Sequence, residues 1–224
     1  MSKELKEFLA EEQMVIGVLG AIGSGKSTLS SQLSEILGVT RVEENFPENP
    51  FLKKFYENPA EYSFRSQVWF LKSTIDQMIS VESEHPGKSL IFDPANEMNL
   101  VYAKTHLDLG WMKEDEYGLY LQLYEILTEK SGVKKPDFFL CIDSKEEVLV
   151  ERIKKRARPY ELHNLEKFPD YLVQLNKNVL EFVNRSGNNI IEINSETDFS
   201  SEKNMSRLLG AINRGITQIE NFSL

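Results

Sequence analysis

Eight residues near the start of the chain have the types and the spacing that bind a nucleotide phosphate. They fit the pattern Gly-x-x-x-x-Gly-Lys-Ser/Thr at every position, and Thr28 follows them: Gly20, Ala21, Ile22, Gly23, Ser24, Gly25, Lys26 and Ser27. Glycine lets the backbone turn its N–H groups toward a β-phosphate, and the helix that follows adds the positive end of its dipole. Lys26 can bridge the β- and γ-phosphates while the Ser27 hydroxyl ligates Mg²⁺. The run therefore predicts a site for ATP.

A loop of this kind requires a strand before it and a helix after it. Residues 14–19 are a short apolar run of buried-strand length, and residues 28–37 carry apolar side chains at 29, 33, 36 and 37, the spacing of a helix face. Gly38 is a typical helix stop. The alternative is a glycine- and serine-rich turn that matches by chance, and such a turn would not need these flanks.

Length and composition limit the class of protein. With 224 residues, 41% of them hydrophobic and 27% charged, the chain suits a single α/β domain with a leading helix over residues 1–13. No run approaches the apolar length of a membrane span, and the first residues lack the pattern of a secretory signal, so we expect a cytoplasmic protein without a membrane partner. Cys141 stands alone in an apolar run, which predicts a buried strand cysteine in a reducing compartment.

Charge and histidine spacing exclude two further classes. A formal net charge of −9 argues against a nucleic acid polymer as partner, because that affinity comes from many lysine and arginine contacts to phosphate. His85, His106 and His163 have no metal-ligand spacing, and one cysteine cannot form a zinc site. We assign them no chemistry.

Acidic residues follow two of the predicted strands. Residues 39–43 read as a strand that leads into Glu44, and residues 89–93 read as a strand that ends in Asp93. In open parallel sheets the carboxyl ends of the strands face the ligand, so Glu43 or Glu44 could reach a substrate beside the phosphates. Asp93 could assist Mg²⁺ through water, as the aspartate of a Walker B strand does. The alternatives are a solvated acidic loop after residue 43 and a turn or cap residue at 93.

A basic cluster lies at the end of the helix predicted over residues 145–157. It contains Arg152 and Arg156, which share one helix face, and is followed by Arg158. Basic side chains at a helix C-terminus are favoured by the dipole, so a solvated helix end is one interpretation. In a phosphoryl-transfer enzyme the same cluster can close over the triphosphate and offset charge in the transition state.

The remaining pattern alternates strands with helices. We expect helices over residues 51–58, 59–81, 97–109, 113–129, 169–184 and 201–219, and strands over 138–143 and 189–193. This order predicts a P-loop NTPase-type three-layer α/β fold, with a five-stranded parallel sheet, helices on both faces and an arginine-rich lid. Trp69 and Phe70 are expected in the core rather than against a ligand. Leu119, Leu123, Ile126 and Leu127 form an apolar face that could serve the core or a partner subunit.

Several segments in order resemble the deoxynucleoside kinase family, and especially its bacterial deoxyadenosine/deoxyguanosine branch. The resemblance runs from about residue 14 to residue 193. It rests on the phosphate loop, EENFPENPFLKKFYENP, the glutamine helix FRSQVWFL, the strand SLIFD, the lid RIKKRARPYE and the helix FPDYLVQLNKNVLEFV. It implies transfer of the ATP γ-phosphoryl group to the 5′-hydroxyl of a deoxynucleoside in nucleotide salvage, and a homodimer formed through the two helices between residues 97 and 129.

The resemblance also implies roles for residues at matching positions. Glu44 matches the glutamate that takes the proton from the attacking 5′-hydroxyl, and Gln67 matches a glutamine that pairs with the base edge. Arg156 and Arg158 match lid arginines over the phosphates, and Glu161 matches an acid that holds the sugar 3′-hydroxyl.

The sequence departs from the family after Asp93, which matches the acid at the end of the third strand. The family normally continues with arginine and serine, whereas this chain has Pro94 and Ala95. Thr74 and Asn99 occupy positions where some members carry an arginine and an aspartate near the base, which places Asn99 in the expected substrate site. Two other functions remain open: a nucleoside monophosphate kinase, and a nucleotide-binding scaffold without catalysis.

Overall fold

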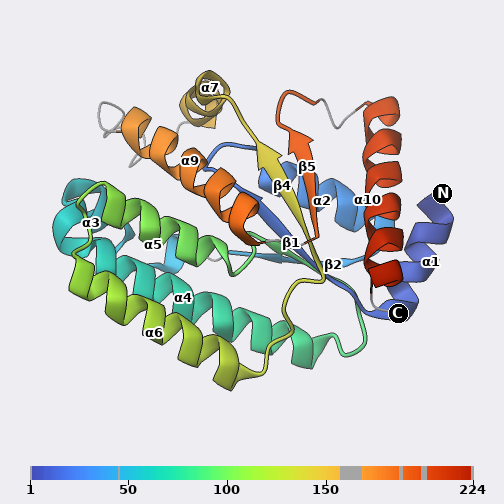
Figure 1. Ribbon diagram of the computed structural model, residues 1–224, viewed down its shortest axis with the longest axis horizontal. Helices are drawn as coiled ribbons and strands as arrows, with labels where there is room; N and C mark the ends of the chain where they lie inside the picture. Colours follow the sequence, from blue (N-terminus) through green and yellow to red (C-terminus); the bar gives the residue numbers. More distant parts are fainter. Residues whose placement is uncertain (1, 45, 157–167, 187–188, 198–200, 223–224) are drawn as a thin grey trace.

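The computed structural model shows a sheet between two layers of helices (Figure 1). It describes residues 2–44, 46–156, 168–186, 189–197 and 201–222. The sheet contains β1 Val15–Gly20, β2 Thr40–Glu43, β3 Leu90–Asp93, β4 Phe138–Asp143 and β5 Ile190–Asn194. Its strand order is β2-β3-β1-β4-β5, and every neighbouring pair is parallel. The predicted five-stranded parallel sheet with helices on both faces is therefore confirmed.

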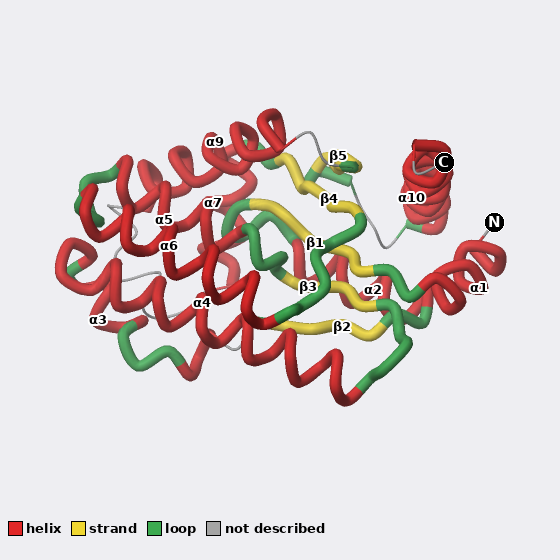
Figure 2. The backbone as a smooth tube through the Cα atoms, turned by 60° about the horizontal axis from the view of Figure 1, so that its bottom comes forward, coloured by secondary structure: helices red, strands yellow, loops and turns green. Residues whose placement is uncertain are grey.

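Three helices cover one face of the sheet, and Figure 2 shows α1 and α10 on the side of the strands opposite to α4, α5 and α6. They are α1 Ser2–Glu12, α2 Lys26–Leu37 and α10 Glu202–Phe222. Leu5 and Leu9 of α1 are buried in the core that these helices form with β1 and β4. Burial of these apolar faces is the main source of stability for the layer.

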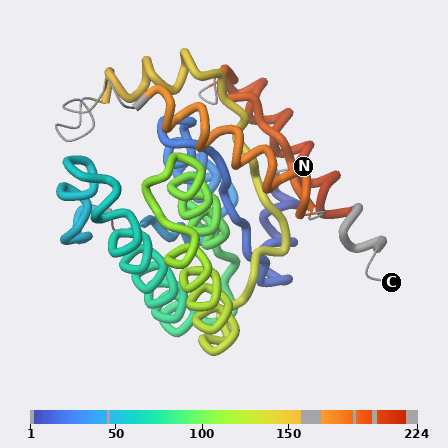
Figure 3. Tube along the Cα trace, turned by 60° about the vertical axis from the view of Figure 1, so that its left-hand side comes forward, coloured from blue at the N-terminus to red at the C-terminus, as the bar shows by residue number. Residues whose placement is uncertain are grey.

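The second face carries the remaining helices. They are α3 Leu52–Glu57, α4 Pro59–Glu84, α5 Met98–Asp108, α6 Glu114–Ser131, α7 Glu146–Arg156 and α9 Phe168–Ser186, with a 3-10 turn η1 over Phe46–Glu48. Figure 3 shows α4, α5 and α6 running side by side. Among the helices that the structure describes, none is long and apolar enough to cross a membrane.

Several helix boundaries differ from the expected ones by two or three residues. Helix α2 begins at Lys26, two residues before the expected start, because Gly25 takes a left-handed φ of 103° directly before it. Helix α4 continues to Glu84, three residues beyond the expected end, and Glu82 in this added turn accepts a hydrogen bond from the Lys134 N–H at 2.8 Å. Of the predicted apolar face, Leu123 and Leu127 pack on the core, whereas Leu119 and Ile126 are exposed.

The centre of the sheet is packed closely enough to require glycine at one position. A Cβ atom on Gly17 of β1 would lie 2.6 Å from the Phe139 ring and 2.9 Å from the Ala95 Cβ atom. The Ala95 N–H also donates to the Val18 carbonyl at 2.9 Å. The segment after β3 is therefore held directly over β1.

Candidate active site

A cavity of about 850 Å³ opens at the carboxyl ends of the strands, the expected place for a ligand in a parallel sheet. It is lined from the phosphate loop, the ends of β2 and β3, helices α3, α4, α5, α7 and α9, and the segment after β5. Its volume lies in the usual range for small-molecule sites. One cavity thus joins the predicted phosphate site to side chains from five other helices.

The phosphate loop has the geometry of an anion cradle. Gly23 and Gly25 both have positive φ, 84° and 103°, and α2 starts immediately after them. Ser24 is 2% exposed, and its Oγ has no hydrogen-bond partner among the described residues. A buried hydroxyl without a partner is unfavourable, so a phosphate oxygen that accepts its hydrogen would satisfy it. The loop therefore fits a phosphate on an observation independent of the motif.

The other predicted nucleotide residues divide into two groups. Residues 22 to 28 line the cavity, whereas Gly20 and Ala21 do not. The carbonyls of Gly20 and Ala21 instead accept hydrogen bonds from Lys26 Nζ at 2.9 and 3.0 Å. Burial lowers the pKa of Lys26, and the nearby Asp93 and Glu44 carboxylates oppose that shift.

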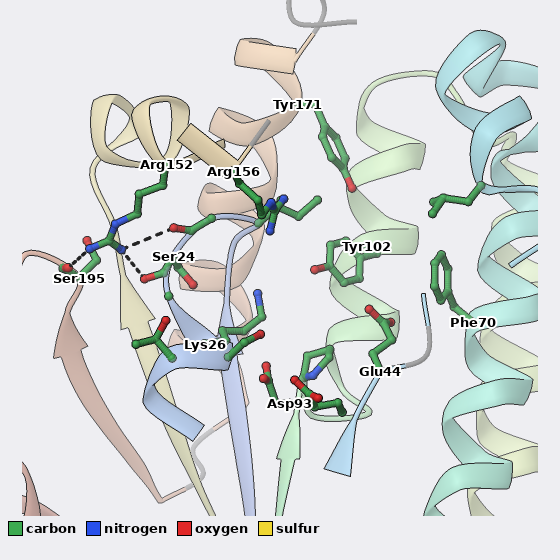
Figure 4. A pocket seen from close by; sticks show the side chains of 18 of the residues that line it. Ser24, Lys26, Glu44, Phe70, Asp93, Tyr102, Arg152, Arg156, Tyr171 and Ser195 are labelled. Carbon is green, nitrogen blue, oxygen red and sulfur yellow. Dashed lines mark hydrogen bonds between the residues drawn. The ribbon is translucent and has the colours of Figure 1, made fainter. Parts of the chain in front are cut away.

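Two carboxylates reach the cavity from adjacent strands. The Glu44 N–H donates to the Asp93 carbonyl at 3.1 Å, which continues the β2–β3 pairing by one residue. Both side chains line the cavity, and Figure 4 shows Asp93 close to Lys26 and Glu44 between Asp93 and Phe70. Glu43 also borders the cavity, but it is exposed and pairs with Arg41. The parallel register thus places the two strand-end acids together.

The partners of Asp93 were not predicted. Its Oδ2 atom accepts a hydrogen bond from Ser30 Oγ at 2.9 Å and an ion pair from Arg41 Nη2 at 2.8 Å. Arg41 carries no motif signal, because its contact depends on the β2–β3 register across 52 residues of sequence. Sequence reasoning would have had to know the strand order to find it.

The two described arginines of α7 have different surroundings. Arg152 lines the cavity, but its guanidinium binds backbone carbonyls, donating to Ser24 O at 2.7 Å and to Ser195 O at 2.6 Å. It joins the phosphate loop to the segment after β5. Arg156 lines the cavity near Tyr171 (Figure 4). Arg158 and Glu161 lie outside the described residues.

The end of the cavity away from the phosphate loop is aromatic with one buried amide. Gln67 of α4 is 4% exposed, and its Oε1 has no hydrogen-bond partner among the described residues. Phe70 lines the cavity, so its assignment to the core is wrong, whereas Trp69 does not line it. The side chains around them, which sequence reasoning missed, are Leu52, Phe55, Tyr56, Ser66, Tyr102 and Tyr171.

The tyrosines gave no signal in the sequence because their positions on helices equally suit a core. Tyr102 illustrates the result: burial raises its pKa well above its ordinary value, and the Glu44 carboxylate adds to that shift. Its phenol therefore stays protonated and can act as a hydrogen-bond donor in the cavity.

Asn99 does not line the cavity, in contrast to its expected place in the substrate site. It is 4% exposed, and its Nδ2 donates to Asn96 Oδ1 at 3.1 Å and to Thr74 Oγ1 at 3.3 Å. The Tyr120 hydroxyl donates to its backbone carbonyl at 3.2 Å. Its amide is thus used to join α5 to α4 within the core.

The residues beside the phosphate loop fit a magnesium ion. Ser27 and Asp93 both line the cavity, and Oδ1 of Asp93 has no hydrogen-bond partner among the described residues. The described part of the chain holds no group of three or more His, Cys, Asp and Glu side chains that could bind a metal alone. Mg²⁺ commonly takes one or two protein oxygens and completes its shell with phosphate and water. Ser27, and Asp93 through water, would supply the protein share.

Comparison with known proteins identifies the family. The deoxynucleoside kinase model matches residues 16–216. A deoxyguanosine kinase of Bacillus subtilis is 33% identical over 149 residues, 65% of this chain and 68% of that protein. A deoxyadenosine/deoxycytidine kinase of the same organism is 30% identical over 162 residues, 70% of this chain and 72% of that protein. The structure of deoxyadenosine kinase from M. mycoides with products dCMP and dCDP bound covers 90% of this chain and 100% of that chain, with a TM-score of 0.76 and 25% identity. This chain belongs to the deoxynucleoside kinase family.

Proposed function

We propose that this protein transfers the γ-phosphoryl group of ATP to the 5′-hydroxyl of a deoxynucleoside, with Glu44 as the general base. One observation carries the proposal: a single cavity holds the phosphate loop at one end, a buried glutamine at the other, and Glu44 and Asp93 on its wall. A phosphoryl donor and a nucleoside acceptor need this arrangement, because the transfer requires both molecules in line at one site.

The reaction follows from these positions. Glu44 accepts the proton of the 5′-hydroxyl, whose oxygen forms a bond to the γ-phosphorus while the bond to the β,γ-bridging oxygen breaks and ADP leaves. Lys26 and Arg156 line the cavity and offset the charge on the phosphoryl oxygens. Arg158 would contribute a further positive charge at the phosphates. Glu161 would hold the 3′-hydroxyl. Mg²⁺, when bound, neutralises charge on the β- and γ-phosphates.

Gln67 supports a nucleobase at the far end of the cavity. A carboxamide offers one acceptor and two donors, so it complements the amino group and ring nitrogen that adenine and cytosine share. Rotated by half a turn, it complements the N1–H and O6 edge of guanine. Phe70 and Tyr102 supply aromatic surface on which a base can stack. Asn99, outside the lining, would act on base choice only through Thr74 and the rest of α4.

The charge along the cavity favours a nucleoside over a nucleoside monophosphate as acceptor. Among the described residues that line it, the cationic side chains are Lys26, Arg152 and Arg156, all in the phosphate loop or α7. A monophosphate acceptor needs cations at its own phosphate, and Arg152 is already occupied by two backbone carbonyls. A neutral acceptor needs none.

The protein is also proposed to be a cytoplasmic homodimer. Three apolar side chains on neighbouring helices α4 and α6 are strongly exposed: Ile79 at 46%, Leu119 at 49% and Ile126 at 50%. A second copy of the chain would remove them from water. Sedimentation at several concentrations of the parent and of the Leu119→Glu variant measures this. A parent protein that remains monomeric at all concentrations would exclude the dimer.

The buried free thiol of Cys141 is consistent with a reducing compartment.

A coupled assay of ADP release tests the activity. The acceptors are deoxyadenosine, deoxyguanosine and deoxycytidine, each matched with its 5′-monophosphate. We expect turnover with nucleosides and none with the monophosphates. The Lys26→Ala variant controls for contaminating kinases. Turnover with monophosphates alone would establish the monophosphate kinase instead, and ATP binding without turnover of any acceptor would establish the scaffold.

A further inference from the structure

Asp93 receives its positive partner from a strand that is remote in sequence. Arg41 of β2 donates from Nε to Ser30 Oγ at 2.7 Å and from Nη2 to Asp93 Oδ2 at 2.8 Å. The same guanidinium also pairs with Glu43, two residues along β2. Because side chains at i and i+2 share a face of a strand, and Glu43 is the register partner of Asp93, the three charged groups meet on one face of the sheet.

The network binds Oδ2 of the Asp93 carboxylate and does not use Oδ1. Ser30 is fully buried, and its hydroxyl accepts from Arg41 while it donates to Asp93 Oδ2 at 2.9 Å. The Ser27 carbonyl is an alternative acceptor at 3.2 Å, but a carboxylate is the stronger one. Two donors on Oδ2 fix the plane of the carboxylate. Oδ1, which has no partner among the described residues, then stands at a defined position on the cavity wall.

The guanidinium lies behind the site and not within it. Arg41 does not line the cavity, and its side chain is 17% exposed, whereas the Asp93 side chain is 2% exposed. A lysine at position 41 could supply the charge, but a single ammonium lacks the rigid fork that binds Ser30 and Asp93 together. The function of Arg41 therefore depends on its shape as well as on its charge.

We propose that Arg41, acting with Ser30, is a positioning residue that orients the Asp93 carboxylate toward the metal–nucleotide complex. This inference rests on the proposed kinase function. The chain has no cation directly after Asp93, because Pro94 lines the cavity there and Ala95 packs against Gly17. The positive partner of the Asp93 carboxylate is instead Arg41, which reaches it from the neighbouring strand β2. Partners that orient a metal-assisting group typically change metal affinity or activity by about 10- to 100-fold when removed.

Calorimetric titration of a non-hydrolysable ATP analogue, with Mg²⁺ and with a chelator, tests this role without turnover. The ratio of the two dissociation constants measures how much the metal strengthens nucleotide binding. In Arg41→Lys and in Ser30→Ala we expect that ratio to fall about tenfold, with binding in chelator unchanged. The Mg²⁺ concentration for half-maximal turnover should rise by a similar factor, while the KM for the nucleoside stays within about twofold.

Two comparisons separate positioning from folding. Thermal melting shows whether each variant folds. Ser30→Ala removes one hydrogen-bond donor to Asp93 and keeps Arg41 as its positive partner. This variant therefore tests the proposal even if Arg41→Lys unfolds. Arg185→Lys makes the same chemical change at an exposed arginine paired with Glu181, and should leave the ratio unchanged. An unchanged ratio in folded Arg41→Lys and Ser30→Ala would overturn the positioning role, as would an equal loss of binding with and without Mg²⁺. A parent that phosphorylates no nucleoside rejects the proposed function instead, since the calorimetric ratio is still measurable.

Discussion

Replacement of Gln67 by leucine should make the protein more stable and a poorer enzyme. The Gln67 side chain is 4% exposed, and its Oε1 atom has no partner among the described residues. A buried polar atom without a hydrogen bond costs about 1–3 kcal/mol, and leucine has a similar size without that atom. At about 3 °C per kcal/mol for a domain of this length, Gln67→Leu should raise the melting temperature by roughly 3–9 °C.

If the proposed function holds, the same substitution removes the groups that would pair with the base. The base then enters the cavity with one or two edge groups unpaired, at about 1–3 kcal/mol each. A total of about 3 kcal/mol corresponds to a loss of roughly 10²-fold in kcat/KM for the best nucleoside, since about 1.4 kcal/mol is tenfold. The Kd for ATP, bound at the other end of the cavity, should not change.

Calorimetric melting and steady-state kinetics on parent and variant measure both effects. Gln122→Leu, at an exposed glutamine of α6 that does not line the cavity, is the matched control for kcat/KM and should leave it unchanged. A variant that is no more stable than the parent would show that Oε1 is already satisfied, for example by water. A variant with kcat/KM within threefold of the parent would remove Gln67 from base recognition.

Four further substitutions test Glu44, Glu43 and Lys26 at the site and the buried His106 outside it. Glu44→Gln should lower turnover by roughly 10²-fold or more and Glu43→Gln should change it far less, whereas equal effects would show that the assignment is off by one residue. Lys26→Ala should abolish most turnover with little change in melting temperature, and near-parent rates would refute its role at the phosphates. Burial lowers the pKa of His106 from 6.5 to about 3, so the unfolded chain binds more protons between those values and stability should fall as pH drops, by about 2 kcal/mol at pH 5. His106→Phe should flatten that pH dependence in urea unfolding, and an unchanged slope would assign it to other groups.

The sequence predicted the features that depend on short segments. The phosphate loop, its strand and its helix follow from one run of residues, and the parallel sheet follows from the alternation of strands and helices. The expectation that an acid after residue 43 and Asp93 face the ligand also rests on the sheet, because the carboxyl ends of parallel strands lie at one edge. These predictions needed no knowledge of which helix covers which strand.

The features that were missed depend on contacts between distant segments. Phe70 and Tyr102 sit at positions that suit a helix core equally well, and only the placement of α4 and α5 around the cavity turns them toward it. Arg152 lines the cavity, but the carbonyls of Ser24 and Ser195 that its guanidinium binds were not predicted. Backbone partners of this kind leave no trace in residue types. Asn99 shows the opposite case. It was expected to contact the substrate, but its side chain forms a hydrogen bond between α5 and α4.

The strand order explains why a departure from the family after Asp93 is compatible with an ordered site. Because β3 lies between β2 and β1, its last residue has a neighbour on each side. On the β1 side Ala95 donates its N–H to the Val18 carbonyl and fits against Gly17, while Pro94 lines the cavity. Proline at 94 supplies no cation to the carboxylate. On the β2 side Arg41 supplies one, with its Nη2 atom 2.8 Å from Asp93 Oδ2. The acid at the end of β3 thus retains a positive partner, supplied by the neighbouring strand and not by the next residue.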